Sequence, residues 1–181
     1  MENVQRNNTG LKDKLLELSF YTACAGTISI AESLIPKPFP FLRIGLSNII
    51  LMLLVMNRQE FSALFVLLGR IILAGLVVGT LLMPTSLIAL GSGFVSLIVM
   101  IAVSRMKTKL SWVGISILAA VVHNLTQLVI VRSILIYSDA LFNLIPIMII
   151  LGIATGTVTG ILAVALNQRL PRRINENKIF G

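Results

Sequence analysis

The sequence predicts an all-α integral membrane protein, a bundle of six transmembrane helices with the N and C termini in the cytoplasm. Of its 181 residues, 56% are hydrophobic and 12% are charged, whereas soluble domains carry about 25% charged residues. The apolar residues form long segments, and Lys and Arg collect between them on one side. We expect a single membrane domain over 1–181, with a cytoplasmic segment 1–14, a helix bundle 15–168 and a basic cytoplasmic tail 169–181.

A helix that crosses a bilayer needs about 20 mostly apolar residues. Six segments are candidates, and they run approximately over Leu15–Leu34, Ile44–Met56, Phe61–Leu82, Ser86–Ser104, Ser111–Ile136 and Leu141–Leu166. The second is short and is compatible with a re-entrant or tilted half-helix as well as with a full span. A single helix over 71–104 would be about 51 Å long, which exceeds a bilayer core of about 30 Å. We therefore expect Pro84 to divide that stretch into two helices.

The positions of Lys and Arg predict the orientation. Of the 15 Lys and Arg residues, eleven fall in the connections on one side of a six-helix arrangement and two on the other. The eleven are Arg6, Lys12, Lys14, Arg58, Arg105, Lys107, Lys109, Arg169, Arg172, Arg173 and Lys178. The two are Lys37 and Arg43. Because basic residues collect in cytoplasmic loops, the side with eleven is predicted to be cytoplasmic.

The outer connection after the first segment is rich in proline. Pro36, Pro38 and Pro40 alternate with other residues, which favours an extended, stiff path. This loop is either a rigid connector or a cap over an outward-facing pocket, with Phe39 and Phe41 as lids.

Small residues at four-residue spacing mark helix faces that pack closely in membranes. The sixth segment carries Gly152, Gly156 and Gly160, and the third carries Gly75 and Gly79. The first carries Ala23, Thr27 and Ala31. We expect these faces to pack the bundle's own helices together. The face on the first segment is alternatively a docking surface for a partner protein.

Polar side chains at membrane depth are costly and call for a partner or a function. Those that we single out are Glu32 and Arg43 near the outer ends of the first two segments, Asn48 in the second, Arg70 near the middle of the third, and His123, Asn124 and Gln127 in the fifth. The last three fall within an arc of about 100° on a helix. They therefore form one polar stripe that we expect to face the bundle interior.

Two interpretations of this polar set remain open. The set is either a buried hydrogen-bond network that fixes helix register or the lining of a pocket for an anionic or polar-headed ligand. Arg70 favours the pocket, because a guanidinium pairs best with carboxylate or phosphate. The acidic residue nearest to its depth is Glu32, which we expect closer to the outer surface. We therefore expect a ligand to supply the anion.

The sequence lacks the residue patterns that several kinds of enzyme and metal site require. No two acidic residues are adjacent, and no Walker A pattern occurs, which argues against a diphosphate–metal site and against ATP hydrolysis by that route. One histidine and one cysteine, Cys24, are too few for a zinc site or for a haem with two histidine ligands. The basic charge is spread over short loops without an aromatic-rich surface, which argues against nucleic acid as a partner. We expect no enzyme, no metal site and no cofactor motif.

Four short stretches carry a family resemblance. They are Glu32-Ser33-Leu34-Ile35-Pro36, Ile44-Gly45-Leu46-Ser47-Asn48-Ile49, Gly69-Arg70-Ile71 and His123-Asn124-Leu125-Thr126-Gln127-Leu128. Together they resemble the small membrane family named Gx transporter or heptaprenyl diphosphate synthase component I, over about residues 15–168. That family is similar in size and helix count to the substrate-binding S components of energy-coupling factor (ECF) transporters.

The resemblance implies a multi-pass protein of the bacterial cell membrane with an S-component-like fold and a pocket open to the outside. It also implies that the small face of the first helix docks an ECF coupling subunit, with ATPases supplied separately. We expect the chain to bind a small ligand through the polar set. One alternative is a membrane subunit of a quinone- or flavin-linked extracellular electron-transfer system, with an electron-transfer partner. Another is a membrane anchor associated with prenyl diphosphate or quinone synthesis.

Overall fold

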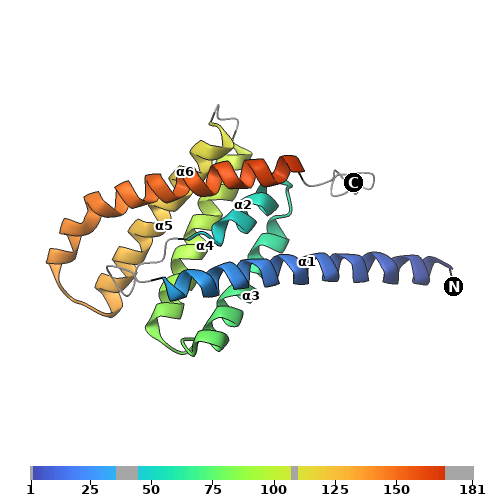
Figure 1. Ribbon diagram of the computed structural model, residues 1–181, viewed down its shortest axis with the longest axis horizontal. Coiled ribbons are helices and arrows are strands. Elements are labelled where there is room, and N and C mark those ends of the chain that lie inside the picture. Colours follow the sequence, from blue (N-terminus) through green and yellow to red (C-terminus); the bar gives the residue numbers. More distant parts are fainter. Residues whose placement is uncertain (1, 36–44, 107–109, 170–181) are drawn as a thin grey trace.

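The computed structural model describes residues 2–35, 45–106 and 110–169, with side chains from Lys12 onward. In these ranges the chain is helical and contains no strand (Figure 1). The helices are α1 (Glu2–Leu34), α2 (Asn48–Met56), α3 (Glu60–Val78), α4 (Pro84–Arg105), α5 (Trp112–Ile134), the short 3-10 helix η1 (Asp139–Leu144) and α6 (Ile145–Arg169). The prediction of an all-α protein is confirmed.

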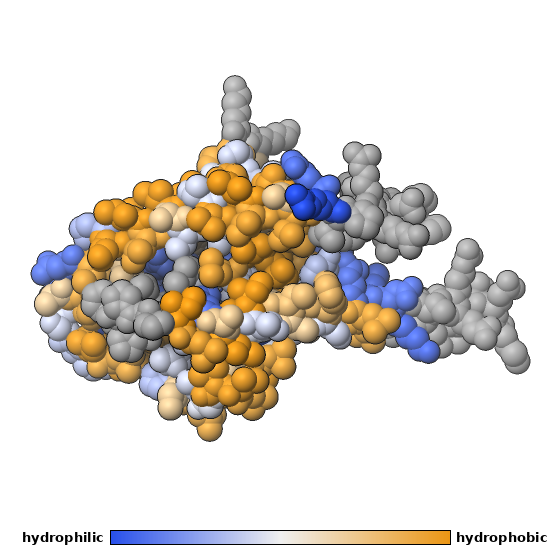
Figure 2. All heavy atoms as spheres, in the orientation of Figure 1, coloured by the Kyte–Doolittle hydropathy of each residue, from blue (hydrophilic) through white to orange (hydrophobic). Residues whose placement is uncertain are grey.

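Four helical stretches of the described chain are long and apolar enough to cross a membrane. They are Glu60–Val78, Pro84–Arg105, Trp112–Ile134 and Asp139–Arg169. In each, less than half of the most apolar 18-residue part is buried inside the protein, from 33% to 44%. The outward-facing side chains are also apolar, as Phe61 and Ile150 illustrate at 83% and 65% exposure. Figure 2 shows this apolar surface over much of the visible face, and lipid is the solvent that such a surface suits.

The second predicted segment is a half-helix in the middle of the bundle. With 9 residues, α2 is about 14 Å long, which is too short to cross a bilayer core by itself. Every residue of α2 from Asn48 to Val55 is buried. It contacts α1, α3, α4 and α6 (Figure 1), so its polar first residue and its apolar body both lie inside the protein.

The break at Pro84 is confirmed. Helix α3 ends at Val78 and is capped by Gly79, whose φ of 73° lies in the left-handed region that glycine adopts readily. The carbonyl of Gly75 accepts the backbone N–H groups of Gly79, Thr80 and Leu81. Pro84 then occupies the first turn of α4, where its missing N–H costs nothing.

This geometry corrects the prediction that Gly75 and Gly79 pack against a neighbouring helix. A Cβ at Gly75 would meet Leu81, in the turn that follows the same helix, at 2.9 Å. A Cβ at Gly79 would meet nothing within 4 Å. Their four-residue spacing therefore reflects the way in which α3 ends.

The three glycines of α6 face the backbone of α5. A Cβ at Gly152 would lie 2.7 Å from the Cα of Val121, and one at Gly156 would lie 2.5 Å from the Cα of Ile117. A Cβ at Gly160 would lie 2.9 Å from the Cα of Val113. Contacts this short leave no room for any side chain, so the glycines allow the two helices to approach closely.

Helix α1 packs on α3 through a face different from the one expected. A Cβ at Gly69 of α3 would lie 2.5 Å from Thr22 Cγ2, so glycine admits the threonine. The predicted packing face of Ala23, Thr27 and Ala31 is exposed instead. The Thr27 hydroxyl donates to the Ala23 carbonyl of its own helix at 2.9 Å. This face is therefore uncovered in the described part of the chain.

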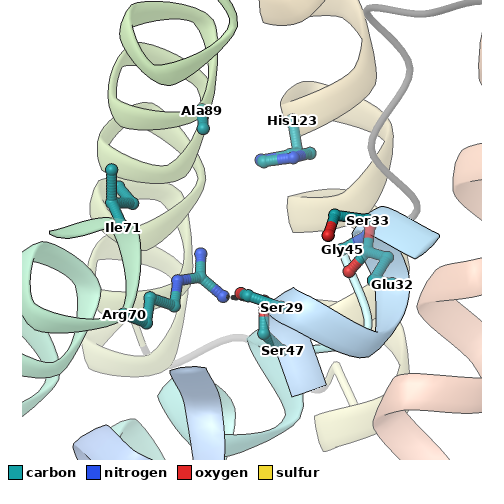
Figure 3. A pocket seen from close by; sticks show the side chains of 9 residues that line it. All are labelled: Ser29, Glu32, Ser33, Gly45, Ser47, Arg70, Ile71, Ala89 and His123. Atoms are coloured by element: carbon teal, nitrogen blue, oxygen red, sulfur yellow. Dashed lines mark hydrogen bonds between the residues drawn. The ribbon is translucent and has the colours of Figure 1, made fainter. Parts of the chain in front are cut away.

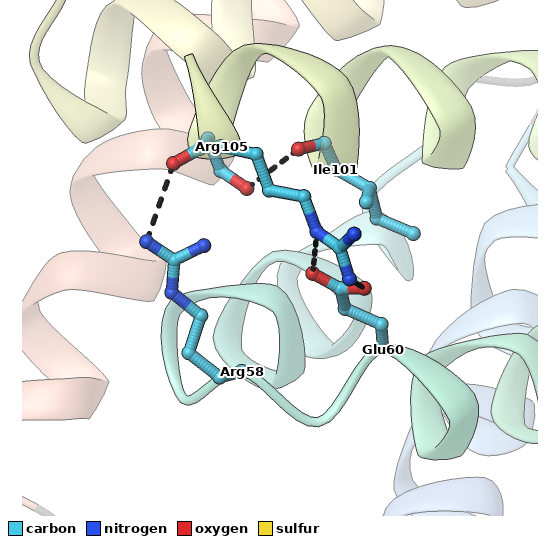
Figure 4. A network of polar contacts seen from close by, with 5 residues as sticks. Arg58, Glu60, Ile101 and Arg105 are labelled. Carbon is cyan, nitrogen blue, oxygen red and sulfur yellow. Dashed lines mark hydrogen bonds and ion pairs between the residues drawn. The ribbon is translucent and has the colours of Figure 1, made fainter. Parts of the chain in front are cut away.

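Polar contacts tie the α2–α3 turn to three other helices at the end of the bundle that holds the start of α5. Arg105 of α4 pairs with Glu60 through two hydrogen bonds, and Arg58 donates to the Ser104 carbonyl at 3.4 Å (Figure 4). Asn57 donates to Asn167 of α6 at 3.0 Å, and Gln59 donates to Glu17 of α1 at 3.3 Å. These contacts gather the predicted cytoplasmic connections at one end.

Candidate functional site

A small polar cavity lies where the end of α1, the start of α2, and the facing sides of α3, α4 and α5 meet (Figure 3). Its lining comprises Ser29, Glu32, Ser33, Gly45, Ser47, Arg70, Ile71, Ala89 and His123. It encloses about 20 Å³, which is the space that one water-sized group needs. Both charge signs and three serine hydroxyls therefore converge on a narrow space inside an apolar bundle.

Arg70 is buried near the middle of α3, at 5% exposure. Its guanidinium donates to the Ser47 hydroxyl (Figure 3). It also donates to Asn48 Oδ1 at 2.8 Å. Hydrogen bonds to a charged group are stronger than neutral ones, and here they hold the arginine against the start of α2. A Cβ at Gly93 of α4 would lie 2.7 Å from Leu67 Cδ1 and 3.5 Å from Arg70 Nη2, so α4 passes close to this part of α3.

Glu32 is the main surprise of the site. It is 4% exposed, and its two carboxylate oxygens accept the backbone N–H groups of Gly45 at 2.7 Å and Leu46 at 3.2 Å. It lines the same cavity as Arg70 and His123, so the bundle itself brings an acidic side chain close to this arginine. The backbone N–H groups explain how an acid is accommodated in the bundle: they satisfy the carboxylate where it is buried.

Gly45 explains the shape of this corner. Its φ of 81° lies in the left-handed region, which residues with a Cβ seldom adopt. A Cβ there would also lie 3.0 Å from Asn48 Nδ2. Glycine thus allows the turn that presents two N–H groups to Glu32 and Asn48 to Arg70. Sequence reasoning did not select Gly45 as a site residue, and its only signal was a place within the stretch Ile44–Ile49.

The three residues of the polar stripe on α5 do not all face the cavity. His123, Asn124 and Gln127 are all buried, as expected. His123 lines the cavity, and its Nε2 lies 2.8 Å from the Gln127 side-chain nitrogen. Asn124 instead donates to the Met148 carbonyl of α6 at 3.1 Å. Asn124 and Gln127 are not among the cavity-lining residues; the first ties α5 to α6, and the second supports His123.

The remaining predicted elements of the site lie outside the described residues. These are Arg43, and the loop 36–44 with Phe39 and Phe41. Among the residues that are described, no group of three or more His, Cys, Asp and Glu side chains gathers. What the described cavity offers is recognition by hydrogen bonds, from one guanidinium, one imidazole, one carboxylate and the serine hydroxyls.

Comparison with known protein families bears on the whole of this region. A model of the family described as heptaprenyl diphosphate synthase component I matches residues 21–166. The chain belongs to this family. The resemblance noted in the sequence is thereby confirmed, and the matched region contains every cavity-lining residue. No curated protein and no solved structure matches the chain. Together with its four membrane-length helices, the family membership makes this a membrane protein in contact with lipid.

Proposed function

We propose that this chain is the membrane-embedded, substrate-binding subunit of an ECF-type transporter and that the Arg70 cavity receives the polar head of a small ligand. The single observation that carries the proposal is the convergence of Arg70, Glu32 and His123 on one cavity inside an apolar bundle. Ionisable groups at such depth are retained mainly where they serve a function. We propose no enzymatic activity.

In this proposal the chain is a multi-pass protein of the bacterial cell membrane, with six helices and cytoplasmic termini. The support is the clustering of basic residues at the end that holds Arg58 and Arg105, tied together by the contacts around the α2–α3 turn. The cavity lies beside the end of α1 and the start of α2, toward the opposite end. A ligand would therefore arrive from the outer side.

The cavity is so narrow that its walls must move apart to admit a ligand. A ligand head larger than a water-sized group must separate the cavity walls, because only about 20 Å³ is enclosed. The bonds from Gly45 and Leu46 to Glu32 join α1 to the segment that begins α2. We propose that this junction adjusts when ligand enters.

Transport would need partners. The exposed face of Ala23, Thr27 and Ala31 on α1 is the proposed contact for a coupling subunit, with ATPases in the same complex. Its small side chains permit close helix approach, and the internal bond of Thr27 leaves no hydroxyl in need of a partner.

Two other functions remain as alternatives, each with one supporting observation. The cavity places an imidazole and a guanidinium on different helices, an arrangement that suits the two carbonyls of a quinone in an electron-transfer subunit. The family description names a component of heptaprenyl diphosphate synthase, which supports a membrane anchor for a prenyl synthase.

Native mass spectrometry of the protein purified gently from its own membranes discriminates these functions, since it weighs both ligand and partner. Transport predicts a bound small molecule and co-purified ATPases; electron transfer predicts a bound quinone or flavin; anchoring predicts a soluble synthase. In the Arg70→Gln variant we expect the small molecule to be lost. Arg132→Gln is the matched control, because Arg132 is half-exposed and pairs with Asp139 at the end of α5.

Ser47→Ala is a second variant that tests the same site if Arg70→Gln fails to fold. It removes one acceptor of the arginine and leaves the charge in place. We expect it to weaken ligand retention. Retention of the same ligand by Arg70→Gln and Ser47→Ala, with unchanged uptake in reconstituted vesicles, would show that the cavity is not the binding site.

A further inference from the structure

His123 and Gln127 form a buried pair one helical turn apart on α5. His123 is 4% exposed and Gln127 is fully buried. The side-chain amide nitrogen of Gln127 lies 2.8 Å from Nε2 of the imidazole. Residues four apart lie on the same helix face, so the pairing follows from the spacing and needs no other element to bring the two together.

The chemistry of the two groups determines where the histidine carries its proton. With the amide nitrogen of Gln127 turned to the ring, as the structure places it, Gln127 can only donate, so Nε2 accepts and carries no hydrogen. In a neutral imidazole one nitrogen accepts and the other donates. The proton of His123 therefore belongs on Nδ1.

We propose that Gln127 is a positioning residue that holds His123 in the Nδ1-protonated tautomer, so that the cavity's histidine offers a hydrogen-bond donor and no acceptor. Among the described residues of the lining, the other nitrogen-bearing side chain is that of Arg70, which is likewise only a donor. The Glu32 carboxylate in the same lining already accepts the N–H groups of Gly45 and Leu46, so the two donors on different helices favour a head group rich in acceptor atoms, either carbonyl or oxyanion. The ligand class rests on the proposed function, whereas the tautomer does not.

The composition of the chain makes the tautomer directly measurable. His123 is the only histidine in the sequence, so protein labelled with ¹⁵N-histidine and purified with a histidine-free tag gives signals from this ring alone. Protonated and unprotonated ring nitrogens have well-separated ¹⁵N shifts. In ligand-free protein in lipid nanodiscs, at neutral pH, we expect a protonated Nδ1 and an unprotonated Nε2.

Two substitutions test the role of Gln127. Gln127→Leu removes the donor, so we expect the Nε2-protonated tautomer to become populated. Gln127→Glu replaces the donor with a carboxylate that accepts, so we expect the proton to move to Nε2. Thr126→Val is the matched control on the same helix, because the Thr126 hydroxyl donates to the Val122 carbonyl within α5. It should leave the ring as in the unsubstituted protein.

The outcomes separate this inference from the proposed function. A protonated Nε2 in the unsubstituted protein would overturn it, and so would a Gln127→Leu spectrum identical to that of the unsubstituted chain. The unsubstituted spectrum decides the tautomer even if the variants fail to fold. If the tautomer is as expected but Arg70→Gln keeps its ligand, the proposed function fails and the role of Gln127 stands.

Discussion

At the scale of single residues, the site depends on groups that satisfy one another inside an apolar bundle. The Glu32 carboxylate has two backbone donors, and the Arg70 guanidinium has a hydroxyl and an amide oxygen. An unsatisfied polar group in a membrane costs several kcal/mol. Each of these partners is therefore expected to contribute to stability as well as to the shape of the cavity.

Glu32→Gln tests the carboxylate. The substituted amide keeps the size of the side chain but offers one acceptor oxygen instead of two, so one of the N–H groups of Gly45 and Leu46 loses its partner. We expect a loss of about 1–3 kcal/mol, measured by thermal unfolding in detergent. Glu17→Gln is the control, because the half-buried Glu17 accepts a single bond from Gln59 at 3.3 Å. Equal losses in the two variants would argue against a special role for Glu32.

Gly45→Ala tests the turn. The substitution combines a left-handed backbone, costing about 1–2 kcal/mol, with a Cβ that lies 3.0 Å from the side chain of Asn48. Gly79→Ala separates the two effects, since Gly79 has a similar φ of 73° but open space around the Cβ. We expect Gly45→Ala to lower the unfolding temperature more than Gly79→Ala and to weaken ligand retention, whereas Gly79→Ala should leave retention unchanged. A larger effect from Gly79→Ala would contradict this account.

At the scale of elements, α2 and α6 stabilise the bundle in different ways. Helix α2 is a buried half-helix whose first residue supports Arg70 and whose far end leads into the turn that contacts α1, α4 and α6. Helix α6 is long and apolar, and its glycines bring it against the backbone of α5. In the absence of a hydrophobic force between helices in lipid, such close packing supplies much of their association.

Gly156→Leu tests the α5–α6 contact. The Cβ alone would lie 2.5 Å from the Ile117 Cα and 2.9 Å from the Ser116 carbonyl, and backbone atoms cannot move aside as a flexible side chain can. Overpacking of this kind typically costs about 1–3 kcal/mol. Ala154→Leu is the control, because Ala154 is exposed on the same helix. Thermal unfolding should separate the two variants, and equal unfolding temperatures would mean that the seam tolerates a side chain.

At the scale of the whole molecule, three polar contacts report on how the helices are arranged. Asn57 with Asn167, Gln59 with Glu17, and Glu60 with Arg105 join segments far apart in the sequence at one end of the bundle. The start of α1 and the end of α6 extend toward the same side (Figure 1). Their basic residues predict that this end faces the cytoplasm.

Thiol labelling tests the orientation. In a Cys24→Ala background, which removes the single cysteine, Tyr137→Cys and Arg58→Cys place one thiol at each end of the bundle, both at exposed positions. A membrane-impermeant reagent should label Tyr137→Cys in intact cells and Arg58→Cys only in inverted vesicles. The reverse pattern would invert the proposed topology, and labelling of both from one side would exclude it.

Local features of the sequence predicted much of the fold. Apolar segments and scarce charge predicted helices in a membrane, Pro84 predicted a helix boundary, and the depth of Arg70 and His123 within their segments predicted that both are interior. These inferences succeed because helix length, proline geometry and the cost of polar groups in lipid each depend on a short stretch of sequence.

Tertiary contacts decided the rest. Glu32 lies in the cavity because a left-handed turn at Gly45, thirteen residues later, supplies its donors. Asn124 lies apart from the cavity because its amide reaches α6. The small face of α1 is exposed because Thr22, on a neighbouring face, enters the space beside Gly69 of α3. Each outcome depends on a partner distant in the sequence, and helical periodicity specifies which residues share a face but not which helix that face will meet.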